Sequence, residues 1–379
     1  MIEFSSKIRV DRVTLYYLKV EVKREFSYGS WPRRFHCIVE LEADGMFGYG
    51  EICIPETDSQ PFNPDIYNAC YHTWLGLSLE AVFRMITDKR GIFPDKVLES
   101  TEMALIDLQG KLFGRSATDL LGLPTSTPTP GLFCILQHEP ERLRAAAETF
   151  LKRGPVTHVK LKLFGNEEHD AKLIRVLRET MGKNCFIAGD VNDGYERDLK
   201  KLTPILKHLA DTGLNACEDP ARMTWEEWHI LQDSVPELHL IPDFPMRLAY
   251  ETVNSAKPGP GMICNLHPDC MGSITAVIAL AKRLKRENIP VMIGDDSLVA
   301  AGCTAWQHLA CGIGAAWVEA LEKPEEFSGF AECVTSSAVH RREDGKYAIS
   351  SSSAGFGLTM DRECLRKISC RCTEYGGYV

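Results

Sequence analysis

The spacing of apolar and polar residues divides the N-terminal third of the chain into two parts. Residues 8–53 alternate as antiparallel strands do, and Ala43-Asp44-Gly45 supplies a hairpin turn between two of the runs. From about residue 65 to residue 122 the apolar spacing becomes helical. We therefore expect a small antiparallel sheet followed by helices.

From residue 132 onward, eight short apolar runs recur, and most gaps between them carry amphipathic helical sequence. Eight β-α units favour a closed parallel barrel. A doubly wound sheet is the alternative, but no G-x-G-x-x-G pattern opens a helix. The runs are LFCIL (132–136), HVKLKL (158–163), FIAGDV (186–191), ACED (216–219), LHLIPD (238–243), MICNL (262–266), VMIGD (291–295) and WVEAL (317–321).

These patterns predict an α/β protein with a (β/α)8 TIM-like barrel and an N-terminal α+β domain that the C-terminal segment completes. We expect the N-terminal domain over residues 1–127. The barrel, with the metal and catalytic residues, follows over residues 128–329. Residues 330–379 then pack back on the N-terminal domain.

Composition narrows the range of functions. The 379 residues are 44% hydrophobic, which is enough for a large core. Net charge is −9, and the basic residues are scattered among acidic ones, so we expect neither nucleic acid nor a membrane surface as partner. No signal-like or membrane-spanning stretch occurs, which predicts a cytoplasmic protein. The 14 cysteines lie in apolar contexts without a C-x-x-C pair, so we expect reduced, buried thiols.

Three consecutive predicted strands end in a carboxylate, namely Asp190, Glu218 and Asp243. Neighbouring strand ends lie about 5 Å apart, so three inward-facing carboxylates repel one another unless a cation holds them. Oxygen ligands without cysteine or histidine favour Mg²⁺ before Mn²⁺. The sequence therefore predicts a magnesium site at the barrel mouth.

Lys160 and Lys162 precede these acids on one predicted strand, where alternate residues share a face. A neighbouring ammonium group and a nearby Mg²⁺ both disfavour the charged form of Lys162, so we expect a lowered pKa and a role as base. The acid that fits this base is a carbon acid next to a carboxylate. Mg²⁺ and Lys160 then stabilise the enediolate that forms.

The sequence resembles the enolase superfamily, in its muconate-lactonizing-enzyme and mandelate-racemase branch. The likeness spans almost the whole chain and rests on the motifs GYGEI, ALIDLQGKLFGRSATDLLG, KLK, GDVND, CEDP, IPD, CNLHPDCMGSI and GFGLTMD. It implies that the N-terminal α+β domain is a capping domain whose loops close over the barrel mouth, and that Lys162 is the base on one face. It also implies that Lys160 faces the substrate carboxylate and that the three acids bind Mg²⁺.

The chain departs from this family at three points. His267 stands where lactonizing-enzyme and dipeptide-epimerase relatives usually place a lysine. Phe244 follows Asp243, where an acidic residue is common, and the eighth run reads Glu319-Ala320-Leu321, where dipeptide epimerases resemble D-x-D. These differences argue against dipeptide epimerisation itself.

Two reactions fit these residues. In a racemase or epimerase, Lys162 removes the α-proton and His267 returns it from the opposite face. In a dehydratase of a hydroxy or sugar acid, His267 protonates the departing hydroxyl. A carboxylate-binding barrel without turnover is a third reading, and a Schiff-base aldolase would not require three carboxylates.

We expect a small-molecule carboxylate as the substrate and, from the resemblance, a homo-oligomer. The residues expected to contact the substrate are Asn192, Asp295, Asp296 and Glu319.

Overall fold

The computed structural model describes residues 2–26, 29–57, 59–123, 126–321, 329–350 and 353–376. Its N-terminal part holds a four-stranded antiparallel sheet in the order β18-β1-β4-β5. Asp44 and Gly45, with φ of 47° and 73°, adopt the left-handed conformation of a tight hairpin turn, which confirms the predicted turn. The strands are β1 (Arg12–Val20), β4 (Arg33–Ala43), β5 (Met46–Glu56) and β18 (Arg371–Gly376), and a small hairpin pairs β2 (Arg24–Phe26) with β3 (Gly29–Trp31).

The helices of the N-terminal part pack against this sheet, and the closest approach is that of β5 to α3 (Asp95–Phe113). A Cβ atom on Gly48 would lie 2.2 Å from the Ala104 carbonyl oxygen, and one on Gly50 would lie 2.1 Å from that of Ser100. Only glycine permits this contact, which gives the GYGEI motif a packing role. The other helices are α1 (Pro64–Tyr71), α2 (Leu79–Asp88) and α4 (Ala117–Leu120).

The β-α repeats follow as predicted for seven of the eight runs. Their strands form a five-stranded parallel sheet in the order β11-β10-β9-β8-β7 and a parallel pair, β12-β13. The strands are β7 (Leu132–Ile135), β8 (His158–Lys162), β9 (Phe186–Asp190), β10 (Ala216–Glu218), β11 (His239–Ile241), β12 (Cys264–Leu266) and β13 (Val291–Ile293). The helices are α5 (Pro140–Lys152), α6 (Glu167–Met181), α7 (Leu199–Asp211), α8 (Trp225–Ser234), α9 (Ala249–Ser255), α10 (Ile274–Arg286) and α11 (Ala301–Ile313).

Backbone hydrogen bonds also connect the two parallel sheets. The Ile263 N–H donates to Leu240 at 3.0 Å, next to the junction of β11 and β12. In the eighth run, Val318 forms parallel bridges to Gly131 on one side and to Ile293 on the other. The described residues thus show a parallel, mixed α/β arrangement in which neighbouring runs are linked. Their strands do not form one closed sheet.

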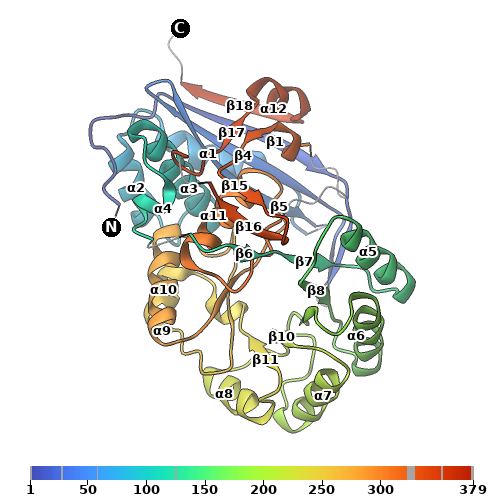
Figure 1. Ribbon diagram of the computed structural model, residues 1–379. Coiled ribbons are helices and arrows are strands. Elements are labelled where there is room, and N and C mark those ends of the chain that lie inside the picture. Colours follow the sequence, from blue (N-terminus) through green and yellow to red (C-terminus); the bar gives the residue numbers. More distant parts are fainter. Residues whose placement is uncertain are drawn as a thin grey trace.

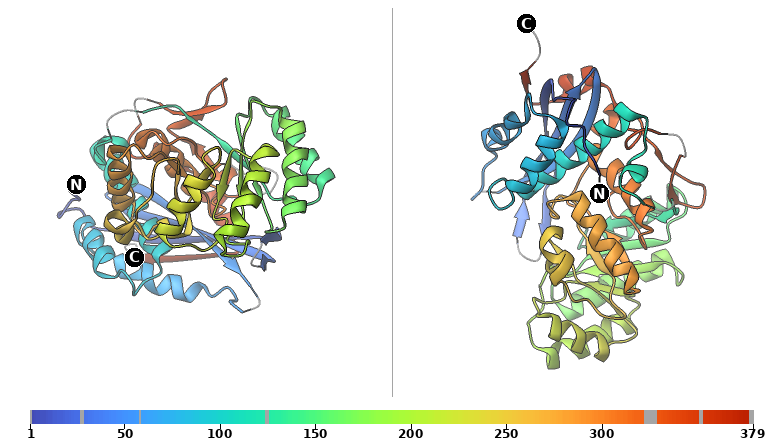
Figure 2. Two further views of the ribbon diagram at one scale, coloured as in Figure 1. Left: turned by 90° about the horizontal axis from the view of Figure 1, so that it is seen from below. Right: turned by 90° about the vertical axis from the view of Figure 1, so that its left-hand side faces the viewer.

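The C-terminal segment returns to the N-terminal sheet. β18 runs antiparallel to β1, with Arg12 opposite Gly376, and Figure 1 shows β18 and α12 (Arg362–Ile368) beside β1. Both views of Figure 2 show the N-terminal elements on one side of the β-α repeats. The remaining strands are β6 (Thr129–Pro130), β14 (Val334–Ser336), β15 (Val339–Arg341), β16 (Lys346–Ile349) and β17 (Thr359–Met360).

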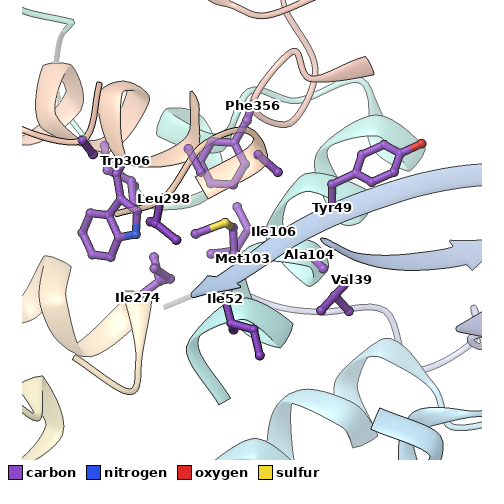
Figure 3. Packing of buried hydrophobic residues seen from close by; sticks show 14 of the residues in the cluster. Val39, Tyr49, Ile52, Met103, Ala104, Ile106, Ile274, Leu298, Trp306 and Phe356 are labelled. Carbon is purple, nitrogen blue, oxygen red and sulfur yellow. The ribbon is translucent and has the colours of Figure 1, made fainter. Parts of the chain in front are cut away.

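A shared apolar core joins the N-terminal elements to the helices that follow β12 and β13. It brings together side chains from β4, β5, α3, α10 and α11 (Figure 3). The labelled members are Val39, Tyr49, Ile52, Met103, Ala104, Ile106, Ile274, Leu298, Trp306 and Phe356. Because this core is continuous, the N-terminal part and this side of the repeats are expected to fold together.

All 14 cysteines are free, and Cys370 and Cys372 are the exposed ones. The remaining thiols are buried or half-buried, as expected for small apolar side chains. None of the described helices is long and apolar enough to cross a membrane.

His308 of α11 should make stability fall in acid. Its ring is fully buried, neither nitrogen has a hydrogen-bond partner among the described residues, and burial lowers its pKa from 6.5 to about 4. Below pH 6.5 the unfolded chain binds a proton that the folded chain does not, so the free energy of unfolding falls as the pH drops towards 4. The full loss is roughly 3 kcal/mol.

Urea unfolding across this pH range measures the effect. In His308→Leu the pH dependence should be weaker than in the wild type by about that amount. His340→Leu, at an exposed histidine, is the matched control and should leave the pH dependence unchanged. Equal pH dependence in the wild type and in His308→Leu would contradict the prediction.

Candidate active site

Lys160 and Lys162 lie on β8 and reach the same carboxylate. The parallel register places Lys162 beside Asp190 of β9, and its ammonium group bonds to the Asp190 carboxylate and to Asn192 Oδ1, the latter at 3.1 Å. Lys160 Nζ lies 3.7 Å from the same Asp190 oxygen. The two lysines therefore share a face, as the alternation of the strand predicts.

Lys160 is the more enclosed of the pair, with 2% of its surface exposed. Its ammonium group contacts Glu218 at 3.0 Å and Glu319 at 2.6 Å. Glu319 was expected to meet the substrate, and the structure places its carboxylate on Lys160. The eighth run thus supplies a further carboxylate, besides Asp190 and Glu218, to the ammonium group of Lys160.

The three predicted metal ligands lie at or just after the ends of consecutive strands. Asp190 and Glu218 are register partners on β9 and β10, and all three carboxylates are buried. Asp243 follows β11, and the Asp219 side chain accepts its backbone N–H at 3.0 Å. Strand register and this local hydrogen bond bring Asp190, Glu218 and Asp243 to one edge of the sheet.

The charges in this group are strongly coupled. Burial and the negative charge of Asp190 raise the pKa of Glu218 to about 8. Burial lowers the pKa of Lys162, but neighbouring carboxylates, Asp190 first, outweigh burial and leave that pKa raised. The lowered pKa that the sequence argument expects for Lys162 therefore does not come from the protein groups alone.

The donor set fits an oxygen-ligated divalent cation. Asp243 Oδ1 is buried and has no hydrogen-bond partner in the described part of the chain, while its other carboxylate oxygen accepts from Arg247 at 2.8 Å. Asn265 Nδ2 donates to Glu218 Oε1 at 2.8 Å, which orients that carboxylate. Among the described residues, Asp190, Glu218 and Asp243 do not form a group whose ligand atoms all lie within 4.8 Å of one another, and each of the three pairs with a lysine or arginine instead.

His267 follows β12, two residues after Asn265. It is buried, and its Nδ1 lies 3.0 Å from the Pro268 carbonyl oxygen. His267 is close enough to Asp243 to lower the pKa of that carboxyl, so it lies beside the predicted metal ligands. The buried carboxylate of Glu99 on α3 fixes the turn that follows, because it accepts the backbone N–H groups of residues 269, 271 and 272 at 2.7 to 3.0 Å.

A cavity of about 660 Å³ opens next to Lys162. Asp295, Asp296 and Glu319, three of the predicted substrate contacts, line it, whereas Asn192, His267 and the three metal-ligand candidates do not. The cavity extends to the β2-β3 hairpin and α5, where aromatic and cationic side chains face it. These are Arg24, Phe26, Trp31, Phe133, Arg142 and Arg153.

Sequence reasoning missed four residues of this neighbourhood. Asn265 shares the strand alternation of His267, and Arg247 lies one helical turn after Asp243, so their spacing offered a signal. Cys270 stands three residues after His267, a spacing that could have indicated two ligands on one turn. Glu99 gave no signal, because its role depends on a contact with a turn 170 residues away.

The chain belongs to the enolase superfamily. The model of the family described as "Enolase C-terminal domain-like" matches residues 142–364, more than half of the chain. This match confirms the superfamily that the sequence motifs indicate.

Individual relatives are distant in sequence, but the three described here match over most of their length. The chain is 22% identical to the N-succinyl-L-Arg/Lys racemase of Bacillus cereus, over 80% of this chain and 84% of that one. The crystal structure of a dipeptide epimerase from Cytophaga hutchinsonii, complexed with Mg and D-Ala-L-Val, superimposes with a TM-score of 0.77 at 20% identity and covers 99% of this chain and 100% of that one. The muconate lactonizing enzyme of Pseudomonas fluorescens gives a TM-score of 0.77 at 17% identity, over 96% and 99%.

Replacing Glu99 with glutamine should loosen the turn that carries His267. Glutamine keeps one acceptor oxygen and turns an NH₂ group towards backbone N–H donors, so at least one buried donor loses its partner. We expect Glu99→Gln to lower the free energy of unfolding by about 1–3 kcal/mol.

The measurement is urea unfolding well above pH 7, because burial raises the pKa of Glu99 to about 7 and the carboxylate must be ionised. The control is Glu80→Gln, which removes a partly exposed carboxylate that pairs with Arg84 on the same helix and should cost little. A loss no larger in Glu99→Gln than in this control would contradict the assigned contact.

Proposed function

We propose that this chain is a racemase or epimerase that removes and returns the α-proton of a carboxylate substrate through an enediolate intermediate. The observation that carries the proposal is Lys162. It ends a parallel strand beside Asp190 and opens onto the cavity, in a chain of the enolase superfamily. Relatives named as an N-succinyl-L-Arg/Lys racemase and an L-Lys-D/L-Arg epimerase support this reaction class.

The proposal includes the architecture. The parallel bridges of Val318 to Gly131 and Ile293 support a closed eightfold barrel, because they join the first run to the seventh through the eighth. The division into residues 1–127, 128–329 and 330–379 is supported by the pairing of β18 with β1, which returns the last segment to the first. In such a ring the second and sixth strands face each other across the mouth, so Lys162 and His267 approach a substrate from opposite sides.

Asp190, Glu218 and Asp243 are proposed to hold Mg²⁺, with Mn²⁺ as an alternative ion. When bound, the cation neutralises the carboxylates and stabilises negative charge on the substrate carboxylate. The unpartnered Oδ1 of Asp243 offers a free buried ligand atom, and the pKa of Glu218, raised by burial and by the charge of Asp190, shows that a further positive charge beside it would be favourable. Neutralising Asp190 also removes the charge that most strongly raises the pKa of Lys162.

Each side chain of the site then has its own role in the proposed reaction. Neutral Lys162 accepts the α-proton from one face, and its protonated form returns a proton to that face in the reverse reaction. Lys160 stays charged, since buried carboxylates surround it, and its ammonium group attracts the substrate carboxylate. His267 serves the opposite face. Asn192 orients Lys162, while Asp295, Asp296 and Glu319 border the substrate cavity.

Dehydration of a hydroxy or sugar acid is the second candidate, and His267 is the observation that favours it. A histidine titrates near neutrality and can protonate a departing hydroxyl, which a lysine does less readily. Carboxylate binding without turnover has less support, because Lys162 is placed for proton transfer.

Chelation should abolish activity, and Mg²⁺ should restore it. Asp190→Asn, Glu218→Gln and Asp243→Asn should each weaken Mg²⁺ binding by about tenfold or more, as measured by isothermal titration calorimetry. Asp344→Asn is the control, because this exposed carboxylate pairs with Arg342 at 3.4 Å in the turn between β15 and β16 and should leave the affinity unchanged. Full turnover in chelator-treated protein would exclude the proposed cation.

Deuterium exchange separates the two reactions. The protein with Mg²⁺ in D₂O is mixed with N-acylated amino acids, dipeptides, hydroxy acids and sugar acids, and NMR follows loss of the α-proton and the product. Lys162→Ala should reduce exchange of at least one stereoisomer by about 10² to 10⁴. Lys172→Ala, on the exposed face of α6, is the control and should exchange as the wild type does.

His267→Asn should retain exchange of the stereoisomer that Lys162 deprotonates. If the protein is a racemase or epimerase, the variant should no longer convert this stereoisomer to the other. If the wild type forms a 2-keto acid and the variant does not, the protein is a dehydratase. Wild-type exchange of every stereoisomer in Lys162→Ala would require a different base.

A further inference from the structure

A mixed group of ligand atoms lies beside the proposed magnesium site. One ring nitrogen of His267, the Sγ of Cys270 and one carboxylate oxygen of Asp296 are within 4.8 Å of one another. They come from the ends of two paired strands, since Leu266 of β12 is the register partner of Ile293 of β13. Among the described residues, no other group of three or more histidine, cysteine, aspartate or glutamate side chains brings its ligand atoms this close together.

The backbone holds His267 and Cys270 in this arrangement. A tight turn returns the chain, with the Cys270 N–H donating to the His267 carbonyl at 3.3 Å and Asp269 in the left-handed region at φ 65°. Glu99 accepts three backbone N–H groups of the same turn. The two ligand atoms are therefore positioned before any ion arrives, which favours binding.

The tautomer of His267 is also fixed. A carbonyl oxygen can only accept, so the Nδ1 atom 3.0 Å from Pro268 carries the proton. Nε2 is left with the lone pair. Metal-binding histidines are commonly held in this way, with the other ring N–H donated to a backbone carbonyl or a carboxylate.

The nearby cations are already paired with other carboxylates. Lys96 Nζ lies 3.0 Å from Asp269 and 3.9 Å from Asp296, so its main partner is Asp269. Arg247 bonds to Asp243 at 2.8 Å. Asp296 is thus the more distant of the two acidic partners of Lys96, and a cation bound at Asp296 has to displace only this longer contact.

We infer that His267, Cys270 and Asp296 form a second cation site, for a borderline ion of the zinc class, separate from the three-carboxylate site. Nitrogen and sulfur ligands select such ions over Mg²⁺, and three protein ligands leave a fourth position open. Tetrahedral zinc ligands lie about 3.3 to 3.8 Å apart, so the side chains must close slightly on the ion. Binding displaces the Cys270 thiol proton to solvent as the metal–sulfur bond forms.

This site bears on catalysis through His267, a step that rests on the proposed function. A bound ion occupies the lone pair that would accept a proton, so Zn²⁺ should stop conversion between stereoisomers while exchange at Lys162 continues. A low concentration of Zn²⁺ would then stop the conversion between stereoisomers without removing Mg²⁺.

Cobalt spectroscopy tests the site without any activity assay. The full-length protein is freed of metal with a chelator, supplied with excess Mg²⁺ and titrated with Co²⁺. We expect one equivalent of Co²⁺ to give a sulfur-to-cobalt charge-transfer band in the near ultraviolet and visible bands of low coordination number. Zn²⁺ should displace the Co²⁺ and remove both.

The variants assign the ligands. Cys270→Ser should lose the charge-transfer band, whereas Cys134→Ser, at a half-buried thiol lining the main cavity, should keep it. His267→Asn and Asp296→Asn should weaken Co²⁺ binding by about tenfold or more. Circular dichroism checks that each variant is folded.

No sulfur band in the wild type, or an unchanged band in Cys270→Ser, would overturn the site. The second result would indicate binding at another thiol, such as exposed Cys370 or Cys372. A positive Co²⁺ spectrum with no effect of Zn²⁺ on conversion would leave the site standing and would count against the role proposed for His267.

Discussion

Buried carboxylates of the N-terminal part accept backbone N–H groups of the β-α repeats, and the geometry of the catalytic mouth depends on these contacts. Glu99 holds the turn after β12, and Glu102, one helical turn further along α3, accepts the N–H groups of Ile274 and Thr275 at the start of α10. Glu51 of β5 does the same for the start of α11. A carboxylate can serve several donors at once, so each contact fixes a whole turn rather than one atom. The N-terminal part therefore fixes the segments that carry His267 and Asp296, besides covering them.

The charge balance at the mouth follows from the same enclosure. Each buried acid has a basic neighbour, with Lys162 on Asp190, Lys160 on Glu218 and Arg247 on Asp243. Separated from water, these groups interact strongly, so a change of charge on one shifts the others. A divalent cation on the acids would compete with the lysines and release them towards the cavity. In the proposed function, binding of the metal would therefore also lower the pKa of Lys162, the proposed base.

Much of this organisation was accessible from the sequence. The strand runs, the hairpin turn and the lysines on one face follow from local periodicity, and the acids share an edge because parallel strands end together. What escaped prediction depends on contacts between distant segments. Glu99 looks like any acid on a helix, and the pairing of Glu319 with Lys160 needs the eighth run to return beside the second. The direct bond of Lys162 to Asp190, which raises the pKa of Lys162 when no cation is bound, also escaped prediction, because it depends on how the two side chains meet across β8 and β9.

The histidine at position 267 is consistent with its surroundings. A lysine ammonium there would lie near the carboxylates of Asp243 and Asp296, which would stabilise its charge and oppose its use as a base. The histidine donates from Nδ1 to the Pro268 carbonyl, which leaves its other ring nitrogen as the one that can accept a proton. That nitrogen is also the kind of ligand that a borderline metal ion prefers, and Cys270 adds a second. Replacing a lysine with a histidine at this turn therefore changes which cations can compete with the proton for the same atom.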